Sequence, residues 1–273
     1  MDFSVDPRAP QRAKGVLSAT FARTGKLTLP QRLFETGGLR WRFPRANGPC
    51  EAAIVNVGGG VAGGDVYRLD LTLTREAEVE ATTVAAEKVY RSDGSVARIE
   101  IRLALESRAR LLWLPQETIL FDGARLERRL LIDLDQESSL LVVERLSFGR
   151  LAMGETRIDA RLHDSWRVLR GGQLVFADEM RLLAAGADLD RPAVGDGARA
   201  LATILAAAPA VEARLPDLRA ALGPSSHAVE AGASFFDGLL VARLLSPSPA
   251  RLRAATIAAI VALGGREPPR LWR

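Results

Sequence analysis

Carboxylates are the side chains of this sequence best suited to chemistry, because the other reactive types are scarce. The chain has one cysteine, Cys50, and two histidines, His163 and His227. It contains no Cys-x-x-Cys or His-Glu-x-x-His spacing, so the sequence does not predict a closed zinc or nickel site built from nitrogen and sulfur ligands. None of these three residues has a sequence neighbour that would make it a nucleophile with its base.

Eight acids lie within or beside apolar or glycine-containing segments, where an ionised carboxylate is costly unless it is paired, solvated or bound to a cation. These acids are Asp65, Glu87, Glu117, Asp122, Glu144, Glu155, Asp178 and Glu179. An ion pair with one of the many arginines is the simplest role for each. Alternatively, Glu117 and Asp122 could be the paired carboxylates of a cofactor-free hydrolase or lyase.

A glycine-rich stretch at residues 56–65 (NVGGGVAGGD) resembles a phosphate-binding loop only superficially. It lacks the Gly-Lys-Ser/Thr sequence, and its glycines lead to Asp65 and then to another predicted strand, so an anion would face a carboxylate. A dinucleotide fingerprint also fails, since no helix follows. We therefore predict a tight connection that needs positive φ angles or a close approach of backbones.

The elements that must position these residues are predicted to be mainly strands in the first two-thirds of the chain. Apolar and polar residues alternate with period two at residues 67–74, 99–106 and 126–134. Less regular runs follow at residues 140–146, 156–162, 166–169 and 174–177, with Gly171 and Gly172 as a hairpin turn. A continuous antiparallel sheet system is the simplest arrangement of these strands.

The pattern changes after Asp178. Residues 198–208 and 251–263 are alanine-rich with apolar residues at helical spacing, so two helices are predicted, and residues 227–245 between them are predicted to be extended. We expect one domain over residues 1–273, with residues 1–14 as a flexible N-terminal segment. Its predicted class is mainly β, an irregular multi-stranded sheet, sandwich or β-helix-like architecture with about two α-helices in the C-terminal third.

The composition indicates which classes of partner and which cellular compartment to expect. The net charge is +4, but 34 of the 37 basic residues are arginines scattered among acids, so no nucleic-acid-binding patch is expected. The apolar run at residues 254–263 is far shorter than the roughly 20 residues that cross a membrane. The first fifteen residues contain no apolar signal region, and one cysteine cannot form an intramolecular disulfide. The cytoplasm is the predicted compartment.

Five sequence blocks together resemble the UreD (UreH) family of urease accessory proteins, and they occur in the family's order. The blocks are residues 56–65 (NVGGGVAGGD), 82–91 (TTVAAEKVYR), 113–124 (WLPQETILFDGA), 144–155 (ERLSFGRLAMGE) and 268–273 (PPRLWR). The similarity extends from about residue 33 to the end of the chain.

This resemblance implies a non-enzymatic scaffold that binds the accessory protein UreF on one side and apo-urease on the other, with the GTPase UreG joining through UreF. It also implies nickel in transit through a water-filled tunnel toward the urease active site, and no tightly bound cofactor. Oxygen ligands and water would hold nickel weakly enough to release it. A pure adaptor without an internal nickel path, or a carboxylate-dependent hydrolase or lyase, are the alternatives.

The motif matches also assign roles to individual residues. The nickel route is expected to be lined by Asp65, Glu144 and Glu179. Structural or interface roles are expected for Gly59, Gly60, Gly63, Gly64, Glu87, Lys88, Gly149 and Arg150.

Overall fold

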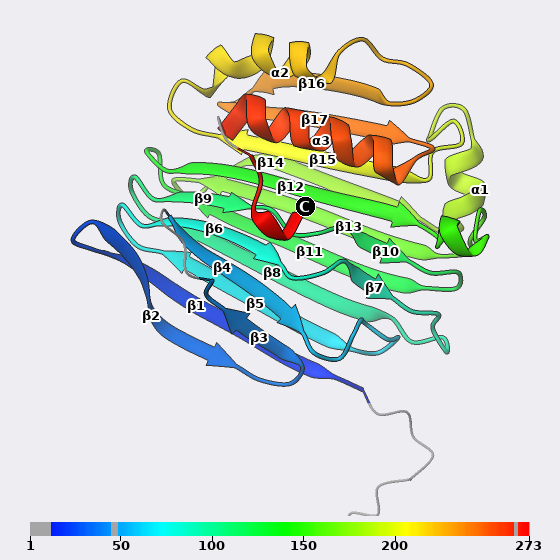
Figure 1. Cartoon of the computed structure of the whole chain (residues 1–273), viewed down its shortest axis with the longest axis horizontal. Coiled ribbons are helices and arrows are strands. Elements are labelled where there is room, and N and C mark those ends of the chain that lie inside the picture. Colours follow the sequence, from blue (N-terminus) through cyan, green and yellow to red (C-terminus); the bar gives the residue numbers. More distant parts are fainter. Residues whose placement is uncertain (1–11, 45–48, 265–266, 273) are drawn as a thin grey trace, which may run out of the picture.

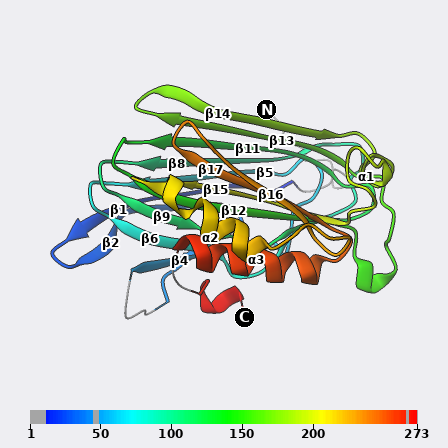
Figure 2. The ribbon, with the colours of Figure 1, turned by 90° about the horizontal axis from the view of Figure 1, so that it is seen from above.

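Two β-sheets lie face to face, and helices cover the outer side of one of them (Figures 1 and 2). The computed structural model describes residues 12–44, 49–264 and 267–272. Most of the N-terminal segment expected to be flexible, residues 1–11, lies outside the described residues, and Lys14 already begins the first strand.

The seven-stranded sheet is formed, in spatial order, by β14 (Gln173–Leu182), β13 (Arg161–Arg170), β11 (Arg125–Leu134), β8 (Ala97–Leu105), β5 (Val66–Leu73), β1 (Lys14–Thr24) and β2 (Leu27–Glu35). The main path of the ten-stranded sheet is β16 (Glu230–Phe236), β17 (Leu239–Ser246), β15 (Ala200–Ala207), β12 (Ser139–Phe148), β9 (Arg110–Trp113), β6 (Glu78–Thr83), β4 (Cys50–Asn56) and β3 (Leu39–Arg42). The short strands β7 (Glu87–Val89) and β10 (Thr118–Leu120) complete it, with β10 pairing to both β12 and β7.

The helical elements among the described residues lie mainly in the C-terminal third. They are η1 (Leu151–Met153), α1 (Ala185–Asp190), η2 (Val211–Arg214), α2 (Leu215–Leu222), α3 (Pro249–Gly264) and η3 (Arg270–Trp272). The mainly β class with helices in this third is therefore confirmed, and α3 confirms the helix predicted at residues 251–263.

The chain winds between the two sheets as a β-solenoid, so most pairs in its centre are parallel. In the seven-stranded sheet β1, β5, β8, β11 and β13 pair in parallel, and in the ten-stranded sheet β4, β6, β9 and β12 do the same. The predicted antiparallel system is wrong here. From β4 to β13 the chain alternates between the two sheets, with β7 and β10 continuing the courses of β6 and β9. The hydrogen-bonded neighbour of a central strand therefore comes from the next coil and runs in the same direction.

Individual strands follow the predicted alternation closely. The segments predicted at residues 67–74, 99–106 and 126–134 are confirmed as β5, β8 and β11. The predicted hairpin is confirmed as well, since Gly171 and Gly172 join the antiparallel strands β13 and β14 with positive φ angles. Residues 227–245 contain β16 and most of β17, as expected. Most of the run at residues 156–162 is not strand, because β13 begins only at Arg161.

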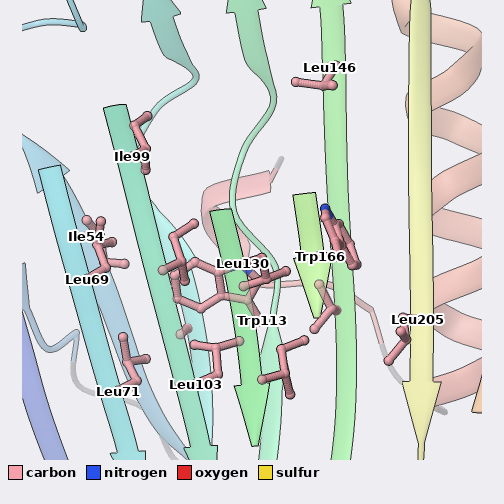
Figure 3. Packing of buried hydrophobic residues seen from close by; sticks show 14 of the residues in the cluster. Ile54, Leu69, Leu71, Ile99, Leu103, Trp113, Leu130, Leu146, Trp166 and Leu205 are labelled. Carbon is pink, nitrogen blue, oxygen red and sulfur yellow. The ribbon is translucent and has the colours of Figure 1, made fainter. Parts of the chain in front are cut away.

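Two hydrophobic clusters lie on opposite faces of the ten-stranded sheet. The larger one fills the space between the sheets, and Figure 3 shows Trp113, Leu130 and Trp166 packed within it. The smaller one lies between the outer face and the helices α2 and α3. The helix predicted at residues 198–208 is wrong: every residue of β15 is buried. A strand covered on both faces is a continuous apolar run without period two, which periodicity cannot distinguish from a buried helix.

Candidate functional site

A small cavity of about 60 Å³ lies between the two sheets and is lined by polar as well as apolar side chains. Its polar lining consists of Tyr67, Thr83, Glu87, Gln116, Thr118, Arg128 and Glu144. A cavity of this size has room for a few water molecules. We call it the inter-sheet cavity.

Glu144 reaches the cavity from β12 and is fixed by two charged or polar donors. Its Oε1 accepts the indole N–H of Trp113 at 2.8 Å, and its Oε2 accepts a hydrogen bond from Arg128 Nη1 at 2.6 Å. Arg128, on the opposite sheet, also donates to both oxygens of Asp164 at 2.9 and 2.7 Å. The three charged side chains are each less than 10 % exposed, so this network ties the two sheets together inside the core.

The network holds two carboxylates and one guanidinium. Burial raises the pKa of Glu144 above its ordinary value, although Arg128 and Trp113 oppose the shift. Burial by itself lowers the pKa of Arg128, but Asp164 and Glu144 more than offset this and raise it. The arginine therefore remains charged, and the network contains one acidic group more than it has cations.

Glu87 is the other acid that lines the cavity, from the short strand β7. Asn56 donates to its two carboxylate oxygens at 3.1 and 3.3 Å. Burial raises the pKa of Glu87 to about 7, Asn56 lowers it, and the nearby charge of Asp65 raises it further. Burial, Asp65 and Glu87 likewise raise the pKa of Tyr67 to about 12. Lys88, the next residue, is exposed.

Asp65 is 4 % exposed and serves as an anchor beside the cavity. Its Oδ1 accepts the backbone N–H of Ala13 at 2.7 Å, and its Oδ2 accepts that of Ala62 at 2.8 Å. The residue is not part of the cavity lining. Its charge acts on the cavity through Glu87, whose pKa it raises.

Glu179 lies apart from the other acids, on the outer face of the seven-stranded sheet. It is exposed, and its carboxylate contacts His163 at 2.7 Å and Arg181 at 2.5 Å, with Arg167 at 3.7 Å. Arg181 and His163 lower the pKa of Glu179. The structure thus brings Glu144 and Glu87 together, places Asp65 beside them and leaves Glu179 elsewhere.

The glycine-rich loop at residues 56–65 supports the cavity from one side. Gly59, Gly60 and Gly64 have positive φ angles, and a Cβ at Gly60 would lie 2.5 Å from the Tyr90 ring. A Cβ at Gly63 would lie 2.6 Å from the Ser92 hydroxyl. These observations confirm the tight connection expected from the sequence.

The block at residues 144–155 turns sharply after β12. Gly149 has a φ of +89°, and a Cβ there would lie 2.4 Å from the Glu155 carbonyl oxygen. Arg150 pairs with Glu155, and this pairing lowers the pKa of Glu155 to about 2. The Arg150 guanidinium also lies 4.4 Å from the centre of the Phe121 ring. Both residues therefore have a structural role in this turn.

The suggested acid pair Glu117 and Asp122 has separate partners. Glu117 accepts the Ser147 hydroxyl at 3.0 Å and lies 3.9 Å from Arg145. Asp122 pairs with Arg91 and accepts the backbone N–H of Asp159 at 2.8 Å. Neither acid lines the inter-sheet cavity.

The described residues were also compared with the requirements of a metal site and of a membrane-spanning helix. No three His, Cys, Asp or Glu side chains among the described residues come together as a group that could hold a metal ion. Within the same residues, each helix is too short or too polar to span a membrane.

Sequence reasoning missed the roles of Arg128 and Asp164. Both occupy inward positions of alternating strands, Arg128 between Leu126 and Leu130, and Asp164 between Leu162 and Trp166. A charged residue in an inward position requires a buried partner of opposite charge. The period-two pattern therefore contains the signal that could have identified both residues, a charge at an inward-facing position.

Comparisons with known proteins agree with the sequence blocks. The family model described as UreD urease accessory protein matches residues 13–273. The urease accessory protein UreD of Beijerinckia indica is 47% identical over 265 residues, which cover 97% of this chain and 98% of that protein. UreD of Methylobacterium sp. is 47% identical over 270 residues, covering 96% and 95%, and UreD of Xanthobacter autotrophicus is 48% identical over 263 residues, covering 96% and 90%. The chain therefore belongs to the UreD family of urease accessory proteins.

Proposed function

We propose that this chain is a non-enzymatic scaffold that links apo-urease to UreF, and through UreF to UreG, and conducts nickel toward the urease active site. The observation that carries the proposal is the inter-sheet cavity, a polar cavity within the hydrophobic core that has Glu87 and Glu144 in its lining. Nickel is the cargo of this route and not a resident cofactor. We expect the assembly to work in the cytoplasm.

The chemistry of the cavity suits a passing divalent cation. Its donors are carboxylate, hydroxyl and amide oxygens, which bind nickel more weakly than imidazole or thiolate ligands do. An acidic group without a balancing cation offsets part of the cost of bringing a divalent ion into a low-dielectric interior. Such a lining favours weak binding of nickel followed by its release.

The proposed route includes Asp65 and Glu144, as the motifs suggest, and we add Glu87. Glu179 is the third acid that the motif matches suggest. Because it lies on the outer face of the seven-stranded sheet, the internal route proposed here leaves it out, and the same experiment tests this difference. The pure adaptor has no use for a buried acidic cavity. For the hydrolase or lyase, a cavity of about 60 Å³ is far below the roughly 300–1,000 Å³ of small-molecule sites.

Co-expression with a urease operon tests the proposal. The variants Glu87→Gln and Glu144→Gln remove a negative charge but keep shape and hydrogen-bonding capacity. We expect each to give a normal yield of the complex with UreF and urease by pull-down, and a lower nickel content of urease. Normal nickel content for both variants would contradict the internal route and favour the pure adaptor.

Glu179→Gln is the matched control, because it removes the same charge from an exposed position. We expect normal complex and normal nickel content for this variant. A lower nickel content of urease for Glu179→Gln alone would indicate that the route runs along the outer face of the seven-stranded sheet. Loss of the complex for any variant would instead assign a structural role to that acid.

A further inference from the structure

The ten-stranded sheet is interrupted beside the inter-sheet cavity. Strand β6 ends at Thr83 and its continuation β7 begins at Glu87, while β9 ends at Trp113 and β10 begins at Thr118. Because β6 pairs with β9 and β7 pairs with β10, the two interruptions lie side by side. The cavity therefore adjoins a part of the sheet without regular strand pairing.

A few hydrogen bonds cross this interruption. The Gln116 backbone N–H donates to the Thr83 hydroxyl at 2.9 Å, and the Glu87 N–H donates to the Glu117 carbonyl at 2.9 Å. Four residues that flank the interruption belong to the cavity lining: Thr83, Glu87, Gln116 and Thr118. The connection between β9 and β10 has Pro115 and Gln116 in the cavity lining and Leu114 in the hydrophobic cluster on the outer face.

The end of the chain covers that outer face. Residues 267–272, which we call the C-terminal tail, follow α3 and include the short turn η3 (Figure 1). The Trp272 indole N–H donates to the Leu114 carbonyl at 2.8 Å, and Gln116 Nε2 donates to the Leu271 carbonyl oxygen. Trp272 is 1 % exposed. Gln116 thus contacts the cavity on one side of the connection and the tail on the other.

Beneath the tail lies a guanidinium that is poorly satisfied. Arg145 is 2 % exposed, its Nε has no hydrogen-bond partner, and its guanidinium lies 4.4 Å from the centre of the Trp272 ring. Burial lowers the pKa of Arg145 to about 10. Moving the tail would expose the indole, which is unfavourable, but it would also hydrate Arg145. The two effects oppose each other, so displacing the tail costs less free energy than exposure of the indole alone would cost.

We propose that the C-terminal tail is a lid on a port through the ten-stranded sheet. With Trp272 in place, the inter-sheet cavity is closed on this face. With the tail displaced, residues 114–117 lose their cover on the outer face and can move away from residues 83–87, which opens the cavity toward the surface. Nickel as the passing species rests on the proposed function, but the opening is a property of this chain and is measured without nickel.

Thiol labelling of the isolated full-length chain tests the lid. In a Cys50→Ser background, Thr118→Cys places one cysteine in the cavity lining, and labelling with a small methanethiosulfonate reports its accessibility. We expect Trp272→Ala to raise the labelling rate by about tenfold or more, because it removes the buried indole and its hydrogen bond to Leu114. Arg270→Ala changes an exposed tail residue and is expected to leave the rate unchanged.

A second cysteine separates local opening from unfolding. Ala77→Cys, also in the Cys50→Ser background, places a thiol in the inter-sheet core outside the cavity lining, and its labelling should not change with Trp272→Ala. If Trp272→Ala accelerates both positions, Trp272→Phe becomes the deciding variant. It keeps an aromatic ring but removes the indole N–H bond, and a rate increase confined to position 118 is expected.

The lid is refuted if neither Trp272 variant gives a selective increase at position 118. The outcome is independent of the nickel experiment. Selective opening together with normal nickel content in Glu87→Gln and Glu144→Gln would support the lid and contradict the nickel route. No selective opening together with lowered nickel content would contradict the lid and support the nickel route.

Discussion

Arg128 is the cation that pairs with two buried carboxylates between the sheets. Its guanidinium bonds to Glu144 and Asp164 on strands of different sheets, and all three side chains are buried. Two carboxylates without their shared cation would have no solvent to stabilise them. The network therefore links the two sheets through one residue, in addition to the hydrophobic cluster between them.

We expect Arg128→Leu to lower the free energy of unfolding by about 3–5 kcal/mol, because it leaves two buried carboxylates without a cation. Arg129→Leu is the neighbouring control, since Arg129 pairs with Glu127 on the surface and its side chain is 60% exposed. Its cost should be below about 1 kcal/mol. Urea denaturation of both variants checks the prediction, and similar costs would show that the network contributes little.

Glu87 should make stability depend on pH. Its pKa is about 7 in the folded chain, compared with 4.5 for an ordinary glutamate. Between these values the unfolded chain has released the proton and the folded chain retains it, so stability falls as pH rises and stays lower above pH 7. Glu87→Gln removes this titration. We expect its stability relative to the native chain to rise by roughly 1–3 kcal/mol from pH 5 to pH 8.

Urea denaturation of the native chain and Glu87→Gln at both pH values measures this difference. Other titrating groups affect both proteins equally and cancel in the comparison. A difference that is the same at pH 5 and pH 8 would show that Glu87 ionises normally in the folded chain.

At the scale of elements, the glycine-rich loop is rigid because neighbouring segments touch it. Gly60 approaches the Tyr90 ring and the Lys88 carbonyl, whereas Gly59 has open space around its Cα. Both have positive φ angles. The two positions therefore separate the cost of a collision from the cost of the backbone conformation.

We expect Gly60→Ala to destabilise the chain by about 2–4 kcal/mol, because collision and backbone strain act together. Gly59→Ala should cost only about 1–2 kcal/mol, the cost of the backbone conformation alone. Thermal unfolding of the two variants gives the comparison. Equal losses would indicate that Tyr90 moves away without cost.

The sequence predicts single elements better than their arrangement. Period two located β5, β8 and β11, since each has one face in the core. The direction of pairing was wrong, because it depends on a neighbour one coil away and leaves no trace in the strand itself. Strand β15 was mistaken for a helix since both its faces are buried.

The candidate site was predicted in part for related reasons. Glu144 lies in a sequence block and lines the cavity. Glu87, for which the motifs suggest a structural or interface role, lines it as well, whereas Glu179 lies apart from it. Which acids lie close together depends on how the strands of successive coils are aligned with one another. The pairing of Thr118 with Glu87 across β10 and β7 is such a contact, and no local pattern encodes it.

At the scale of the whole molecule, large apolar side chains gather on a terminal strand. Leu27, Leu29, Leu33 and Phe34 of β2 are each at least 41% exposed. Among the described strands, β2 pairs only with β1 and ends the seven-stranded sheet. A terminal strand with exposed apolar residues is a site for association with another chain.

We expect the combination of Leu33→Lys and Phe34→Lys to reduce self-association of the isolated chain at high concentration, with a change below about 0.5 kcal/mol in unfolding free energy. Static light scattering measures the association. Met153→Lys with Val194→Lys changes exposed residues away from the strands and should have little effect. Equal improvement by both pairs would attribute the effect to net charge alone.

The solenoid winding also sets an order of assembly during synthesis. Hydrogen bonds between successive coils join residues close in sequence: Arg98 and Glu127 are 29 apart, and Arg108 and Glu76 are 32 apart. A coil can therefore pair with its predecessor soon after it leaves the ribosome. The C-terminal tail emerges after every strand that it contacts. The nascent protein consequently passes through a stage in which its sheets are paired and the outer face of the interruption between β9 and β10 is not yet covered.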